Sequence, residues 1–186
     1  LMPKSILGTL GQKMKDGVVG AIKSVDEVYD TIFETVRSNA VGLLKGTGDV
    51  GGAGIGAVEE LVVGAIHAIT ETGAAVTEGV HDIVKGTITG VADAGGEAGA
   101  AVKNTVRGAI RGVSEVEGDV VNASVKAVSG AIEGVRTVGG DVGKATEDAV
   151  TGAIETVGGV SQSAVGEVKK TLSDSVDGAK DVISRI

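Results

Sequence analysis

The chain has 186 residues, among them 32 glycines, one phenylalanine, one tyrosine and no tryptophan, so the bulky side chains that fill a thick globular core are nearly absent. Its net charge of −8 argues against nucleic acid as a partner, because phosphate binding needs clustered cations. The absence of cysteine excludes disulfides, thiolate chemistry and most zinc sites.

Residues 1–19 predict an N-terminal helical start. Apolar residues recur there at helical spacing, at Ile6, Leu10, Met14 and Val18. Pro3 suits the first turn of a helix, and the apolar part of this segment is too short for a secretory signal.

No apolar run in the chain approaches the roughly 18 residues that a membrane-spanning helix needs, so we expect no transmembrane span.

From residue 20 to residue 186 the sequence contains about 7.6 copies of a 22-residue unit, and we treat this stretch as one repeat region. The first position of the unit is glycine in seven successive copies: Gly20, Gly42, Gly64, Gly86, Gly108, Gly130 and Gly152. The third position of these copies is always a large aliphatic residue: Ile22, Leu44, Ile66, Ile88, Ile110, Ile132 and Ile154.

The apolar positions within each unit are three or four residues apart, about 3.67 on average, which is the period of an 11-residue helical repeat and not that of a strand. The sequence therefore predicts an all-α protein. Its simplest form is one long amphipathic helix, about 280 Å if unbroken, that packs with others in a bundle, tube or filament.

The glycine column lies at one edge of the apolar face, beside a second column of small residues one helical turn along, a spacing that lets two helix backbones approach closely. We predict a helix-packing interface made of the glycine column, the aliphatic third column and six valines, namely Val80, Val84, Val102, Val106, Val128 and Val150. Each helical glycine costs roughly 1 kcal/mol relative to alanine, so this face must be covered by a partner surface.

Three glycine-rich stretches are candidate hinges: residues 46–56, 95–96 and 139–140. Hinges at these places would fold the chain into four antiparallel helices. The 22-residue phase continues through all of them without an insertion, which favours a continuous or gently hinged helix. Tandem duplication of a 44-residue hairpin would preserve the phase as well, so both alternatives stay open.

No catalytic, cofactor-binding or metal-binding set can be assembled from the sequence. His67 and His81 fall on polar positions and are interpreted as solvated surface residues. The stretch "GTGDVGGAG" has closely spaced glycines, but neither a buried strand nor a Gly-Lys-Ser/Thr sequence accompanies it, as nucleotide binding would need.

The repeats resemble those of the synucleins and, more distantly, the perilipins and exchangeable apolipoproteins. The similar segments are "TEGV" at 77–80, "IEGV" at 132–135 and "ETVGGV" at 155–160. This resemblance implies a free chain that becomes helical on lipid. A second resemblance, to right-handed coiled-coil stalks with 11-residue repeats, implies helices that pack side by side.

We therefore expect a non-enzymatic structural protein that self-assembles through its Val/Ile/Gly face into a homo-oligomeric bundle, tube or filament, which could enclose lipid or other apolar molecules. The alternative is a peripheral protein that coats a membrane, droplet or granule surface. The scarcity of aromatic residues and the lack of a basic flank beside the apolar face weaken this alternative, since interfacial helices usually use both.

Overall fold

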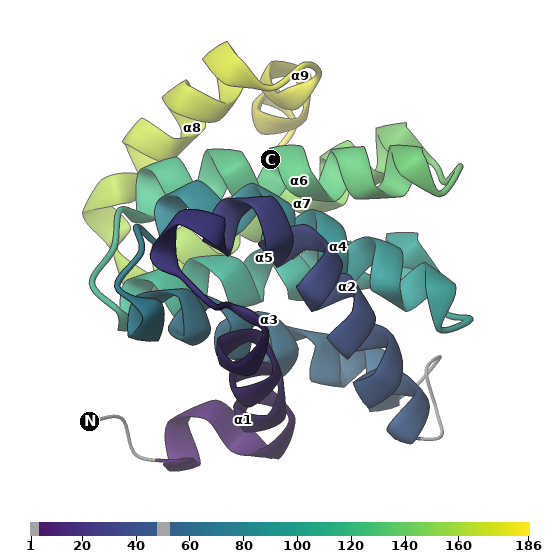
Figure 1. Ribbon diagram of the computed structural model, residues 1–186. Coiled ribbons are helices and arrows are strands. Elements are labelled where there is room, and N and C mark those ends of the chain that lie inside the picture. The colour runs from purple at the N-terminus through teal and green to yellow at the C-terminus, as the bar shows by residue number, and fades with distance from the viewer. Residues whose placement is uncertain (1–3, 48–52) are drawn as a thin grey trace.

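The computed structural model describes residues 4–47 and 53–186, with side chains from residue 7 and residue 56 onward in these two ranges. All regular structure in these residues is helical (Figure 1). The described α-helices are α1 (Lys4–Ala21), α2 (Val28–Gly46), α3 (Ala53–Thr72), α4 (Val80–Asp93), α5 (Ala98–Glu115), α6 (Val120–Thr137), α7 (Val142–Val160), α8 (Val165–Ser175) and α9 (Ala179–Ser184). Short 3-10 turns precede α2, α4 and α8.

The chain does not run as the single long helix that its periodicity predicts. It turns back at Gly73, Gly95, Glu117 and Gly139, which are 22 residues apart and all have positive φ, between 59° and 97°. A residue in this left-handed conformation ends an α-helix. Because each turn falls at the same position of the repeat, the helical phase of the sequence continues across it, and the phase alone gives no sign that the helix has ended.

Glycine pairs form two of these turns. At residues 95–96 the amide of Gly96 donates to the carbonyl oxygen of Val91 over 2.9 Å, and at residues 139–140 the amide of Gly140 donates to Val135 over the same distance. This pattern is the Schellman motif, which satisfies the last carbonyl groups of a helix. Gly51 and Gly52, in the third candidate hinge, lie outside the described residues.

The chain also turns where no hinge is predicted. Thr72 is the last residue of α3 before the turn at Gly73, and the amide of Gly118 donates to Val113 over 2.8 Å beyond the end of α5. The chain therefore has more turns than the alternative of four antiparallel helices, which allows turns only at the three candidate hinges.

The helices stack in two rows, because each helix packs along the one two places later in the chain. One row contains α1, α3, α5, α7 and α9, and the other contains α2, α4, α6 and α8. In Figure 1 the stack rises from α1 at the bottom to α8 and α9 at the top. The accessible surface of 8059 Å² is close to the roughly 8100 Å² expected of a folded monomer of this mass, so one copy of the chain is as compact as an ordinary monomeric protein.

The core is built mainly from valine, isoleucine, leucine and alanine side chains of α2 to α7, and buried residues of α1, α8 and α9 extend it at the two ends of the stack. Buried hydroxyl groups within it bond to their own helix. Thr87 donates to the carbonyl oxygen of Ile83 over 2.8 Å and Thr105 donates to that of Ala101 over 2.7 Å. Such local bonds satisfy a polar group without a partner from another helix.

Candidate functional site

Four glycines of the predicted column, Gly64, Gly86, Gly108 and Gly130, face the helix two places earlier in the stack. We call this side of a helix its back face and the side toward the helix two places later its front face. A Cβ atom built at these glycines would lie close to the carbonyl oxygen of the facing backbone: 2.8 Å from Phe33 at Gly86, 2.7 Å from Glu59 at Gly108, 2.5 Å from His81 at Gly130, and closer still to Gly11 at Gly64. Any larger residue at these four positions would push the two helices apart.

The remaining three glycines of the column have different surroundings. At Gly152 the nearest atom to an added Cβ would be the Cγ of the Lys103 side chain, at 3.2 Å. At Gly20 and Gly42 no atom lies within 4 Å of that position. These two belong to α1 and α2, whose back faces have no earlier helix in the described part of the chain to cover them.

The small residues one turn after the column contact branched or small side chains. An added Cβ would lie 3.0 Å from the Cβ of Ala40 at Gly90, 3.0 Å from the Cβ of Ile66 at Gly112 and 2.9 Å from the Cβ of Ile88 at Gly134. Isoleucines of the aliphatic column thus pack directly on glycines of the next helix in the same row, where no side chain separates them from the backbone.

The predicted aliphatic and valine positions lie inside the single chain. The following are buried: Leu44, Ile66, Ile88, Ile110, Ile132, Val80, Val84, Val102, Val106, Val128 and Val150. Ile22 and Ile154, near the two ends of the stack, are only partly buried. The structure therefore brings most of these residues together within one copy.

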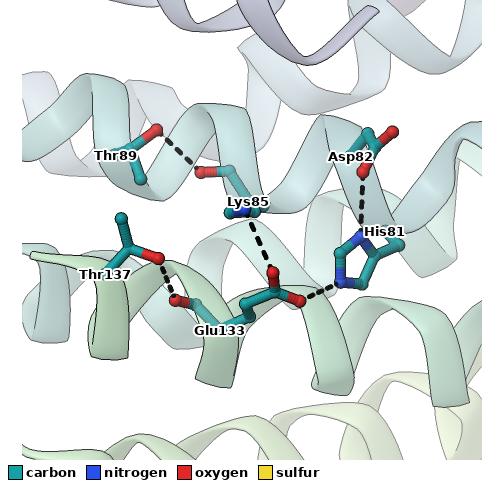
Figure 2. Close-up of polar contacts among 6 residues, drawn as sticks. All are labelled: His81, Asp82, Lys85, Thr89, Glu133 and Thr137. Carbon is teal, nitrogen blue, oxygen red and sulfur yellow. Dashed lines mark hydrogen bonds and ion pairs between the residues drawn. The ribbon is translucent and has the colours of Figure 1, made fainter. Parts of the chain in front are cut away.

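Ion pairs link the stacked helices along both rows. The carboxylate of Glu133 on α6 has two partners on α4: it lies 3.0 Å from Nζ of Lys85 and 2.7 Å from Nε2 of His81 (Figure 2). The hydrogen bond from Lys85, and next that from His81, lower the pKa of Glu133, while partial burial opposes them. Lys85 also lies 5.0 Å from the ring centroid of Phe33 on α2, so its side chain connects three helices of one row.

Similar pairs join other helices two places apart. They are Lys15 with Glu71, Arg37 with Asp93, Glu59 with Arg111, and Lys103 with Glu155. These partners are 52 or 56 residues apart in sequence. The front-face members of the pairs recur every 22 residues, so the sequence itself contains a signal for these contacts. They are Lys15, Arg37, Glu59, His81 and Lys103.

The interpretation of His67 as a solvated residue is wrong. Its side chain is 4% exposed, and its Nε2 lies 2.9 Å from Oε1 of Glu115 on α5. His67 occupies a polar position of the repeat, but this position faces the neighbouring helix of the row rather than solvent. His81 is half-buried and contacts Asp82 as well as Glu133, with 2.9 Å between its Nδ1 and the aspartate (Figure 2).

His67 and His81 each contact a carboxylate of the helix two places later, Glu115 and Glu133 respectively. A carboxylate that orients a histidine can belong to a catalytic triad, but the triad also needs a hydroxyl or thiol nucleophile at the other nitrogen. At His81 both ring nitrogens contact carboxylates. Within residues 4–47 and 53–186, no group of three or more His, Cys, Asp or Glu side chains is placed to hold a metal ion.

Two aspartates form helix N-caps that the sequence reasoning missed. Asp119 accepts a hydrogen bond from the amide of Asn122 over 3.1 Å, and Asp141 accepts one from Lys144 over 3.0 Å. They are 22 residues apart and each follows a turn glycine, which is a recognisable start signal for a helix. Glu97 holds the same position before α5 but makes no capping bond with its side chain.

An open groove of about 590 Å³ lies between the N-terminal parts of α5 and α7. Small residues of α5 line it together with the charged side chains of Glu97, Lys103, Asp141 and Lys144. A groove with this mixed lining offers no enclosed apolar site for a lipid chain.

None of the helices in the described ranges is both long and apolar enough to cross a membrane. No protein-family model matches the chain, and no curated protein matches it in sequence.

Proposed function

We propose that this chain is a non-enzymatic structural protein that self-assembles into a homo-oligomer by continuing its own helix stack from copy to copy. The observation that carries the proposal is the repetition of one contact: glycines on the back faces of α3, α4, α5 and α6 each meet the backbone of the helix two places earlier. A structure in which each unit contacts only its neighbours can be extended at its ends without rearrangement.

The surface available for assembly differs from the one expected from the sequence. Most of the Val/Ile/Gly positions are buried inside one copy. Contacts between copies would therefore use the same kind of face at the two ends of the stack, where Gly20 and Gly42 have open space and where Ile22 and Ile154 are only partly buried.

The structure favours this function over lipid-surface coating. A chain that becomes helical only on lipid keeps its apolar face free for the lipid. In this protein most apolar positions of α2 to α7 are buried against neighbouring helices of the same chain. This packing supports self-assembly of an already folded chain over coating of a lipid surface.

Sedimentation velocity and multi-angle light scattering, from low micromolar to near-millimolar protein, test the proposal. We expect the weight-average mass to rise with concentration, and electron microscopy of the concentrated sample to show linear or ring-shaped particles. Circular dichroism without vesicles should already show a helical protein. A monomer throughout the concentration range would overturn the proposal, and helicity that appears only with vesicles would favour the coating function.

A further inference from the structure

The last repeat unit folds differently from the units before it. Gly178 occupies the fifth position of the 22-residue unit. The glycines at this position in α4, α5 and α6 all lie inside a helix, namely Gly90, Gly112 and Gly134. In the last unit α8 ends at Ser175, and Gly178 has a φ of 85°, in the left-handed region, just before α9 begins. The last unit therefore forms two short helices where an inner unit forms one long helix.

The apolar pattern of the repeat nevertheless continues through this break. Val176 stands 44 residues, or two units, after Ile132. Ala179 stands the same distance after Val135, and both of these α6 residues are buried within one continuous helix. A helix that continued from α8 through this segment would present its apolar side chains as α6 does. The same residues can thus form one long helix or the observed two, and the backbone at Gly178 decides between them.

In the observed form α9 packs on α7 and occupies its front face. Ala179 and Val182 of α9 are buried, and so is Val150 of α7. Gly178 also approaches α7, since a Cβ atom built on it would lie 3.5 Å from Cγ2 of Thr146. Inside the stack the front face of α3 is covered by the 18 residues of α5, whereas α9 has only six. Helix α9 therefore stands where a longer helix would continue the row.

The aliphatic column shows how completely each front face is covered. Ile66, Ile88 and Ile110 belong to α3, α4 and α5, which are covered by helices of 18 or 19 residues, and all three are 0% exposed. Ile132 of α6, covered by the 11-residue α8, is 8% exposed. Ile154 of α7, covered by α9, is only partly buried. The cover that α9 provides is thus the least complete of the five, and a small contact of this kind opens most easily.

We infer that α9 is an autoinhibitory strap: it closes the C-terminal end of the stack, and it gives up this place to a helix of a second copy when residues 165–182 straighten into one helix. The inference rests on the proposed function and adds a means of control to it. The front face of α7 then becomes available for the kind of stacking contact that α5 makes on α3. Because α9 belongs to the same chain, it occupies the face at low protein concentration, and a second copy displaces it only as the concentration rises.

A reversible covalent lock tests the strap directly, because the chain has no cysteine of its own. In the variant Thr146→Cys/Gly178→Cys the two side chains are within reach of a disulfide, which is formed at low protein concentration so that it stays within one chain. With the disulfide in place, self-association should be at least tenfold weaker than in the same protein after reduction. The backbone strain of a cysteine at Gly178 is present in both forms, and the unsubstituted chain with and without reductant is the control.

Opening the strap should have the opposite effect. Gly178→Ala disfavours the left-handed conformation and favours the straight helix, so it should strengthen self-association at least tenfold, in a form that reverses on dilution. Gly95→Ala is the matched control, because it introduces the same kind of strain at a turn inside the stack, where φ is 97°, and should leave association unchanged.

A charge on the buried side of α9 opens the strap in a second way. Val182 is 5% exposed in the observed form, so Val182→Asp should drive α9 off α7 and strengthen self-association by a similar factor. Val138→Asp is the matched control. Val138 holds the same repeat position 44 residues earlier and is 38% exposed, so a charge there should have no effect on association.

Sedimentation velocity compares all variants, with circular dichroism and thermal unfolding to verify the fold of each. Weaker association of the locked form and stronger association of the opened variants would support the inference. Association of the unsubstituted chain that neither the lock nor the opened variants change would overturn the inference and leave the proposed function standing. If only the opened variants associate, the strap is supported while the unsubstituted chain fails the test of the proposed function. Monomers in every variant would overturn both.

Discussion

Seven glycines share one repeat position, yet the interior and the N-terminal end of the stack place them in different surroundings. At Gly64, Gly86, Gly108 and Gly130 a neighbouring helix backbone occupies the space that a side chain would need, whereas at Gly20 and Gly42 that space is empty. A glycine in a helix is unfavourable by roughly 1 kcal/mol relative to alanine. In the interior, close packing of the helices offsets this unfavourable term, and at the end nothing in a single copy does so.

The sharpest way to test this difference is to add one methyl group in each place. Gly130→Ala puts a Cβ about 2.5 Å from the carbonyl oxygen of His81, so α6 must move away from α4. We expect this variant to lose about 2 kcal/mol of unfolding free energy in urea denaturation. Gly42→Ala should instead gain up to about 1 kcal/mol in the same measurement, because alanine is the better helix former. Effects of the same sign would show that the two surroundings are equivalent.

The turns offer a second comparison, between glycine and a larger residue in the same conformation. Gly139 has a φ of 79° and Glu117, at the same repeat position, has a φ of 59°. Gly139→Ala should destabilise the fold by about 1 kcal/mol, because an L-residue is strained there, and Glu117→Gly should stabilise it by a similar amount. Thermal unfolding of both variants provides the check, and a stabilising Gly139→Ala would contradict it.

The N-termini of α7 and α5 offer a third comparison, between a capped and an uncapped helix start. Asp141 caps α7 with its side chain, so Asp141→Ala should lower the unfolding free energy by about 1 kcal/mol. At Glu97, which makes no such bond, the substitution Glu97→Ala should change it by a few tenths of a kcal/mol at most. Chemical denaturation can compare the two variants side by side. Equal losses would mean that the capping bond contributes nothing.

The smallest expected effect concerns the ion pairs between helices. Glu133→Gln removes the charge that Lys85 and His81 contact, and because the glutamate is 43% exposed we expect a loss of only about 0.5 to 1 kcal/mol at neutral pH. Since the pKa of Glu133 is lowered in the folded state, its stabilising contribution is fully present above the unfolded pKa of about 4.5 and is lost as the pH falls through the folded value.

Urea denaturation from pH 7 down to pH 3 tests this pH dependence. The difference between the original chain and Glu133→Gln should shrink in acid. Glu155→Gln is the control, because Glu155 lies 3.8 Å from Lys103 and is more exposed, and it should show a smaller difference at every pH. If the difference in unfolding free energy between the original chain and Glu133→Gln grew in acid, the predicted direction of the pH dependence would be wrong.

The sequence predicts helices, the buried aliphatic positions such as Ile66 and Ile88, and the small-residue spacing, because these depend on a periodicity that survives any arrangement of the helices. It does not predict every helix end, because the turns at Gly73 and Glu117 lie outside the candidate hinges. Gly95 in a turn and Gly86 in a helix contact are the same residue type, and each has glycines 44 residues further along the chain, at Gly139 and Gly130. Only the surrounding structure distinguishes a left-handed turn from a close approach. The sequence also does not predict the partner of His67, because Glu115 comes near it only when α3 and α5 lie side by side.

The most widely separated ion pairs between described helices, Lys15 with Glu71 and Arg37 with Asp93, span 56 residues, and no described helix packs extensively on one more than two places away. A deletion from Gly86 to Ser129 would remove two helices and join equivalent points of the repeat, so the shortened protein should keep its architecture. Duplication of the same segment should lengthen it. Natural recombination could adjust the length of such a protein in steps of two helices, without inventing a new core.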